Sequence, residues 1–134
     1  MRILLTFALL AASTAASAEL VVVANPGVHF NSLPRAQLGR IFLGQANSFP
    51  DGGQAQPLDI SGAQRNTFYQ DVLKRAPDQI EKYWARMIFT GKALPPRQVR
   101  PAEVKALVAD NPGAISYMDS AQVDASVKVI SITQ

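Results

Sequence analysis

The sequence predicts a single α/β domain, with a mixed sheet of about four strands and helices on both of its faces. Residues 20–24 form a continuous β-branched run without polar alternation, which is typical of a strand covered on both sides. Apolar residues recur at helical spacing across residues 80–88. The elements follow the order strand, helix, loop, strand, three helices and two strands, and this order indicates a layered α/β domain.

Residues 1–18 match a secretory signal. Arg2 precedes an apolar run over residues 3–10, and small residues close the segment at Ala16 to Ala18. The run is shorter than the roughly 20 residues that a membrane span needs, and no cysteine follows it for lipidation. We therefore expect cleavage before Glu19, a periplasmic location, and one domain over residues 19–134.

The overall charge is small. The chain has a net charge of +3, and slightly less once Arg2 is removed. This balance is too weak to indicate nucleic acid or an anionic membrane as a partner. The sequence contains no cysteine, so the core must hold without disulfides and no thiolate can act as nucleophile or metal ligand.

The first half of the domain combines a helix with a long loop. Ser32 is expected to cap a helix that runs to Phe42, with Gly44 as its stop. His29, the single histidine, lies in the preceding loop and is expected to be solvated. Residues 44–56 form a loop with two open interpretations: a mobile rim with Phe49 packed on the core, or a binding lid.

The second half begins with a strongly amphipathic helix. It is expected to start at Pro77, to end at Thr90-Gly91, and to use Trp84 for packing. Its expected inward set is Ile80, Tyr83, Trp84, Met87 and Ile88. Residues 92–100 form a Pro-rich basic connector, either a solvated surface or a docking patch for an acidic partner. A helix from Pro101 and strands over 114–118 and 127–132 complete the chain, the last strand at an edge or antiparallel.

Residues 57–73 are the best candidate for a site, because they read as a short strand, a tight turn and a helix. The first amides of a helix lack intrahelical acceptors and favour an anion, and Arg65 in the first turn would add a cation. The candidate anion-binding residues are Ser61, Gly62, Ala63, Gln64 and Arg65. The competing interpretation is a capping box, in which Ser61 and Gln64 occupy these amides themselves.

Catalytic chemistry finds no support in the sequence. The ten acidic residues are expected on loops and helix surfaces, and none forms an isolated pair inside an apolar stretch. A lone histidine without a nucleophile elbow makes a hydrolase a remote third hypothesis. No phosphate-loop or dinucleotide motif is present. We therefore predict no catalytic residues, no metal and no cofactor, and a protein that is not an enzyme.

Several segments resemble a known family in combination. They are the Leu33–Gly44 helix segment, Phe49-Pro50-Asp51-Gly52, Arg65 with Phe68, Tyr83-Trp84 with Ile88-Phe89-Thr90-Gly91, and Asn111-Pro112-Gly113-Ala114-Ile115-Ser116-Tyr117. This pattern is similar to the phosphate-binding, substrate-binding-protein-like family of bacterial phosphate importers, with the type II periplasmic binding protein fold. The resemblance implies binding of phosphate or a similar oxoanion.

Two departures limit that implication. Family members have two lobes that close on the anion, whereas residues 19–134 resemble only the second lobe. The family's Ser-Gly-Thr phosphate turn corresponds here to Gly62-Ala63-Gln64, which lacks both hydroxyl donors. We therefore predict weak anion binding. The alternative is a ligand-free interaction or sensory-accessory protein, whose partner would be a membrane transporter, a sensor or a second copy.

Overall fold

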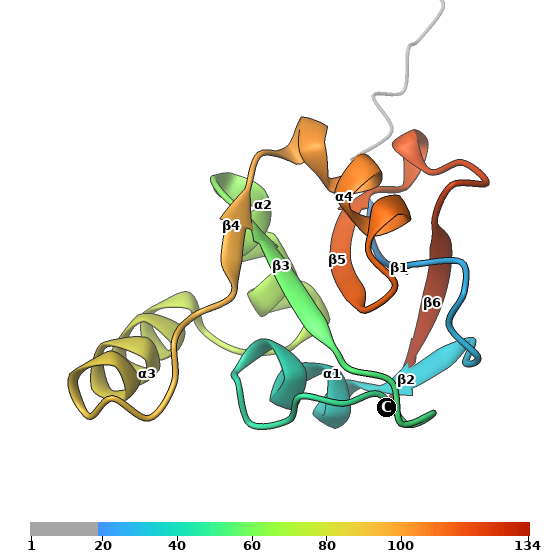
Figure 1. The fold of residues 1–134 in the computed structure, drawn as a ribbon. Helices are drawn as coiled ribbons and strands as arrows, with labels where there is room; N and C mark the ends of the chain where they lie inside the picture. The colour runs from blue at the N-terminus through green and yellow to red at the C-terminus, as the bar shows by residue number, and fades with distance from the viewer. Residues whose placement is uncertain (1–18) are drawn as a thin grey trace, which may run out of the picture.

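The computed structural model describes residues 19–134. The expected signal segment, residues 1–18, lies outside the described residues, so its cleavage stays a prediction. Six strands form one sheet in the order β2-β6-β1-β5-β3-β4 (Figure 1). The strands are β1 Leu20–Ala24, β2 Ser32–Pro34, β3 Gln56–Ile60, β4 Arg97–Val99, β5 Ala114–Asp119 and β6 Lys128–Thr133.

The sheet is mixed, as expected. Strand β1 runs antiparallel to both of its neighbours, β5 and β6. Strand β3 runs parallel to β5 and β4, and β2 runs parallel to β6. The expected antiparallel pairing of the last strand is therefore confirmed, although β2 and not β6 forms that edge of the sheet.

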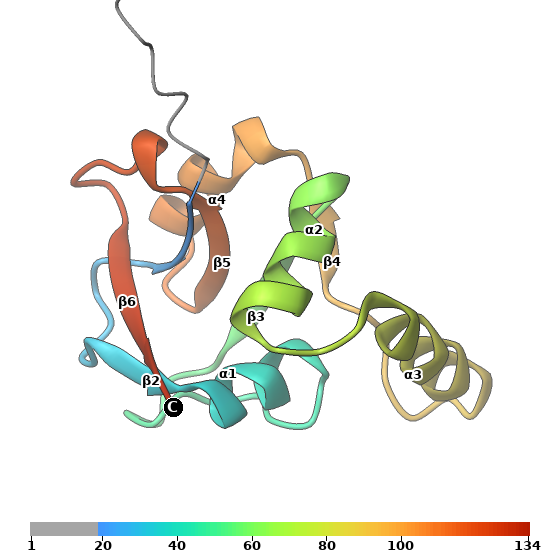
Figure 2. The same ribbon diagram turned by 180° about the vertical axis from the view of Figure 1, so that it is seen from behind.

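The helices cover both faces of the sheet. Figures 1 and 2 show α4 on one face and α2 on the opposite face. The helical elements are α1 Arg35–Phe42, α2 Ala63–Thr67, the π-helical turn η1 Phe68–Val72, α3 Pro77–Phe89, the 3-10 turn η2 Pro101–Glu103, α4 Val104–Asp110 and the 3-10 turn η3 Ser120–Gln122. The α/β class and the single layered domain are confirmed, and none of the helices among residues 19–134 is long and apolar enough to cross a bilayer.

Two expectations about strands and caps are wrong. The sheet has six strands instead of about four, because the three-residue strands β2 and β4 are too short to show a periodic pattern. Ser32 lies in β2 and pairs with Ser131, so it does not cap α1, and the N-cap of that helix is Pro34.

The central part of the core lies between the sheet, α1 and η1, and α4 adds buried residues on the other face. Phe68 stacks on Tyr117 with ring centroids 3.9 Å apart, and Phe42 packs on Phe68 at 4.8 Å. All three side chains are fully buried. Aromatic rings therefore tie α1 and η1 to β5 at the centre of the sheet.

Helix α3 lies beside this core as a projecting element (Figures 1 and 2). Trp84 is buried, which confirms its packing role, and the hydroxyl of Tyr83 donates to the Leu43 carbonyl at 2.7 Å. Ile88 was expected to face inward, but it is 51% exposed. The prediction is wrong there because the stripe of α3 is covered only in part: Met87 in the last turn packs against the core, whereas Ile88 lies at the edge of the stripe in solvent.

Candidate functional site

The predicted site is the exposed turn between β3 and α2. Ser61, Gly62 and Ala63 are exposed, and the Ser61 amide donates to the Val99 carbonyl of β4 at 3.1 Å. Gly62 is the N-cap residue with φ 101° and ψ −159°, a backbone conformation that essentially only glycine adopts. The chain therefore needs glycine at this position to turn from β3 into the helix.

The capping box does not form. Gly62, and not Ser61, is the N-cap of α2, and no side chain accepts a hydrogen bond from its first amides. Among the described residues, the amides of Gly62, Ala63 and Gln64 have no acceptor. The side-chain oxygen of Gln64 is instead buried beside a cavity of about 270 Å³ lined by Ile60 and Met118. The donors at the start of the helix are thus left to solvent or to a ligand.

Arg65 takes part in a buried polar cluster, defined here as Asp59, Arg65, Tyr69 and Tyr117. The Arg65 Nε donates to Asp59 Oδ2 at 3.0 Å, and the Tyr69 hydroxyl donates to the same oxygen at 3.0 Å. The Tyr117 hydroxyl donates to Asp59 Oδ1 and accepts from the Ile60 amide at 3.2 Å. The Asp59 carboxylate is 1% exposed and meets its hydrogen-bonding needs entirely from these neighbours.

The cluster shifts the acidity of its members. Burial raises the pKa of both Tyr69 and Tyr117, and the negative charge of Asp59 raises it further. Burial works against the charged form of Arg65, but the adjacent Asp59 outweighs it and raises the pKa of the guanidinium. The phenols therefore stay protonated and Arg65 stays charged over the physiological range.

The neighbouring elements explain how the cluster is held in place. Asp59 lies on β3 between the buried Leu58 and Ile60, and β3 lies between β5 and β4. Tyr117 comes from β5, where it is fixed by its stack on Phe68. The Arg65 guanidinium also lies 5.1 Å from the centre of the Tyr69 ring. The Arg65 guanidinium is thus held by the Asp59 carboxylate and by the face of the Tyr69 ring.

Asp59 is absent from the site residues predicted from the sequence. All acidic residues were expected on loops and helix surfaces, and this is wrong for Asp59, which is buried inside β3. The available signal was a single carboxylate within an otherwise apolar strand, because such a group must find partners when it is buried. Its partners come from residues 6, 10 and 58 positions away, and only the fold brings them together.

The structure gives no functional role to the remaining candidates, His29 and the 44–56 loop. His29 is exposed, and its amide donates to Asp51 at 3.2 Å. Phe49 is buried against Phe30, which favours the packed-rim interpretation of the 44–56 loop over the lid. Among the residues that the structure describes, no group of three or more histidine, aspartate or glutamate side chains could hold a metal ion.

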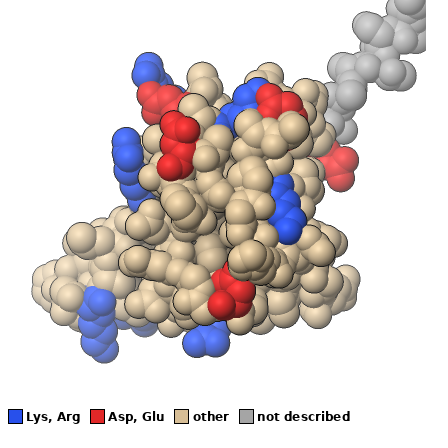
Figure 3. Space-filling view, turned by 45° about the vertical axis from the view of Figure 1, so that its right-hand side comes forward, with Lys and Arg blue, Asp and Glu red and all other residues tan. Residues whose placement is uncertain are grey.

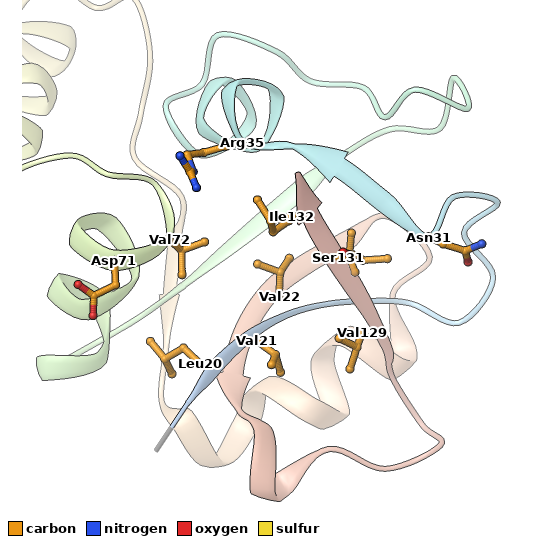
Figure 4. Close-up of a pocket in the computed structure, with 11 residues that line it drawn as sticks. Leu20, Val21, Val22, Asn31, Arg35, Asp71, Val72, Val129, Ser131 and Ile132 are labelled. Carbon is orange, nitrogen blue, oxygen red and sulfur yellow. The ribbon is translucent and has the colours of Figure 1, made fainter. Parts of the chain in front are cut away.

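One groove lies away from the predicted site. It has a volume of about 460 Å³ and lies between β1, β6, α1 and η1, with Arg35 above an apolar floor that includes Val22 and Ile132 (Figure 4). None of the residues Ser61 to Arg65 lines it. The predicted anion site therefore lies outside this groove, and of its residues only Gln64 lines the cavity of about 270 Å³ described above.

Comparison with known proteins places the fold. No family model matches the chain. Among solved structures, a Clostridium perfringens protein with bound phosphate, assigned as a phosphate ABC transporter substrate-binding protein, is similar with a TM-score of 0.65 and 14% identity. An ABC-type phosphate transport receptor from Vibrio cholerae is similar at 0.62 and 20%, and PstS from Borrelia burgdorferi at 0.64 and 11%.

These matches define a class by fold. They cover 84%, 84% and 86% of this chain but only 44%, 45% and 47% of the three other chains, so the chain spans less than half of their length. The protein therefore has the fold of about half of a phosphate ABC transporter substrate-binding protein. The expected resemblance to one lobe of this architecture is confirmed at the level of fold.

Proposed function

We propose that the protein is an exported, non-enzymatic binding module that holds a phosphate-like oxoanion weakly at the start of α2. The observation that carries the proposal is the set of three amides, of Gly62, Ala63 and Gln64, which lack acceptors among the described residues. Unpaired amides at a helix start carry partial positive charge and point at the space where an anion would lie. The helix that they begin continues without a break into η1.

The contacts of Arg65 suit it to position an anion by hydrogen bonds more than to attract it by charge. Its Nε is used by Asp59, which leaves the terminal guanidinium nitrogens available to an anion. The Asp59 carboxylate, however, compensates much of the positive charge at short range. A guest would therefore be held mainly by directed hydrogen bonds.

The expected affinity is low for a geometric reason. The turn is exposed, and a ligand there would be contacted from one side and would stay hydrated on the other. The fold relatives are about twice as long, and their remaining half has no counterpart among residues 19–134. We expect a dissociation constant of about 1 mM, which corresponds to roughly −4 kcal/mol.

The comparisons support the class of ligand and the compartment. The Clostridium perfringens structure contains bound phosphate, and the Vibrio cholerae protein is described as a phosphate transport receptor. With the predicted signal over residues 1–18, we place the mature domain in the periplasm, where it would serve transport or signalling without catalysing a reaction.

Titration of residues 19–134 with phosphate, sulfate and acetate at constant ionic strength tests this proposal. Amide chemical shifts of Gly62 to Arg65 are expected to move with phosphate and saturate in the millimolar range. Arg65→Gln should weaken binding about tenfold, whereas Arg40→Gln, which removes an exposed cation from α1, should not. Gly62→Ala should abolish binding, because alanine does not readily adopt the backbone conformation of this turn. This variant changes no charge.

Unchanged amide shifts at 50 mM phosphate, or equal binding by the Arg65→Gln variant, would reject the site. Thermal melts of each variant must accompany the titration, since Arg65 is also a partner of the buried Asp59.

A second candidate function is a ligand-free interaction scaffold. The observation in its favour is that Asp59 already compensates the guanidinium of Arg65, while large apolar side chains are exposed near the end of α3. The partner would then be a membrane transporter, a sensor or a second copy. Light scattering that finds a strict monomer, both alone and in periplasmic extract, would count against this candidate.

A further inference from the structure

The segment from the last turn of α3 to the following loop exposes an unusual amount of apolar surface. Of the four large apolar side chains that are exposed among residues 19–134, three lie in this segment: Ile88 at 51%, Phe89 at 92% and Leu94 at 78%. We name Ile88, Phe89 and Leu94 the apolar tip. Single exposed apolar residues are common on protein surfaces, but a group on one projecting element indicates an interaction surface.

The chain segment that carries the apolar tip has only positive charges, and the nearest acidic residue of α3 is Glu81, about two turns before Phe89. Residues 82–98 contain four cations, Lys82, Arg86, Lys92 and Arg97, and no aspartate or glutamate. All four side chains are exposed. In Figure 3 the projecting part at the lower left is largely uncharged, with basic side chains at its lower edge. The net charge of the whole chain conceals this local concentration, so the sequence argument against an anionic membrane does not apply to the tip.

The cations and Phe89 are layered along α3. Lys82, Arg86 and Phe89 follow the spacing i, i+4, i+7, so they share one face of the helix. At a rise of 1.5 Å per residue, Arg86 lies about 4.5 Å and Lys82 about 10 Å behind Phe89 along the axis. Along the helix axis an apolar end is therefore followed by cations. In a bilayer the apolar interior is likewise followed by anionic headgroups, so the two layers match.

The shape favours a membrane over a protein groove. Helix α3 projects from the body in both ribbon views, so its end is convex and can enter an interface without a complementary pocket (Figures 1 and 2). The hydroxyl of Thr90 donates to the Arg86 carbonyl at 2.8 Å, so part of the helix end is already satisfied internally. An apolar helix end with such a cap can leave bulk water at lower cost.

We propose that the apolar tip, together with Lys82, Arg86 and Lys92, docks the protein reversibly on the surface of an anionic phospholipid bilayer. Phe89 and Leu94 enter the boundary between headgroups and acyl chains, and the cations contact lipid phosphates. The turn at Ser61 to Arg65 lies on a different element and takes no part in this contact.

Vesicle co-sedimentation tests the proposal. Residues 19–134 contain every described strand, helix and core side chain, so this part of the chain is the protein to use. The probes are vesicles with 40% phosphatidylglycerol in phosphatidylcholine and vesicles of phosphatidylcholine alone. Binding is expected to the anionic vesicles and to weaken as salt is raised from 50 to 500 mM.

Matched variants separate the two contributions. Phe89→Ser with Leu94→Ser should lower the partition coefficient at least about tenfold, because the apolar insertion is lost. Val129→Ser, which changes the remaining exposed large apolar side chain on β6, should leave it unchanged. Lys82→Gln with Arg86→Gln should lower it about thirtyfold, whereas Arg40→Gln with Arg75→Gln, with the same net charge, should have a much smaller effect.

Failure of the folded wild-type domain to bind the anionic vesicles would overturn the proposal. Equal binding by the Phe89 and Leu94 double variant would do the same. A photocrosslinker at position 89 that captures a protein from extract, without any vesicle binding, would show that the tip serves a protein partner and would also overturn it. All variants have exposed changes and are checked by thermal melting.

Discussion

The buried polar cluster and the apolar tip reverse the usual distribution of residue types. Asp59 is 1% exposed inside the sheet, whereas Phe89 is 92% exposed at the end of α3. The carboxylate is tolerated because Arg65, Tyr69, Tyr117 and the Ile60 amide satisfy it. The phenylalanine has no comparable partner among the described residues. The difference shows that the hydrogen bonds of Asp59 are satisfied within the domain, whereas the apolar tip is left exposed and is available to an external partner.

The phenylalanines of the two regions should differ most in stability. Phe68→Ala removes a fully buried ring that stacks on Tyr117, and it should lower the free energy of unfolding by about 3–5 kcal/mol. Phe89→Ala should change it by less than about 0.5 kcal/mol, because this ring is already in solvent. Urea unfolding of both variants measures the difference. A large loss for Phe89→Ala would show that the tip packs within the domain.

Loss of the buried carboxylate of Asp59 should also cost more stability than loss of an exposed one, although the difference is smaller than for the phenylalanines. Asp59→Asn keeps the shape but loses the ion pair with Arg65, and it should cost about 1.5–3 kcal/mol of unfolding free energy. The control, Glu81→Gln on the exposed face of α3, should cost less than about 0.5 kcal/mol. Equal costs in chemical denaturation would contradict a structural role for the cluster.

Alkaline pH should weaken the cluster selectively. The pKa of Tyr69 and Tyr117 is raised in the folded state above the ordinary value of 10.0, so their contribution is complete below about pH 10 and is lost as the pH rises above it. The loss is at most about 1.4 kcal/mol per pH unit for each phenol. Melting temperatures between pH 9 and pH 11 should fall more steeply for wild type than for Tyr69→Phe. Parallel curves would contradict the burial of these hydroxyls.

Local pattern determined most of the secondary structure. The β-branched run at residues 20–24, the Pro77 start of α3 and the Gly91 region after its end all correspond to observed elements. Periodicity and end signals are properties of neighbouring residues, so the sequence alone contains them. The family resemblance likewise predicted the fold of one lobe, which the structural comparisons confirm.

Tertiary structure decided the remaining features. The partners of Asp59 lie up to 58 residues away, and no local pattern could assign them. Strands β2 and β4 exist because β6 and β3 offer them edges for pairing, since three residues carry too little pattern of their own. The helical stripe of α3 predicted Ile88 inside, but the body covers Tyr83, Trp84 and Met87 and leaves Ile88 in solvent. Sequence fixes which faces are apolar, whereas only the arrangement of elements in space decides which of those faces are covered.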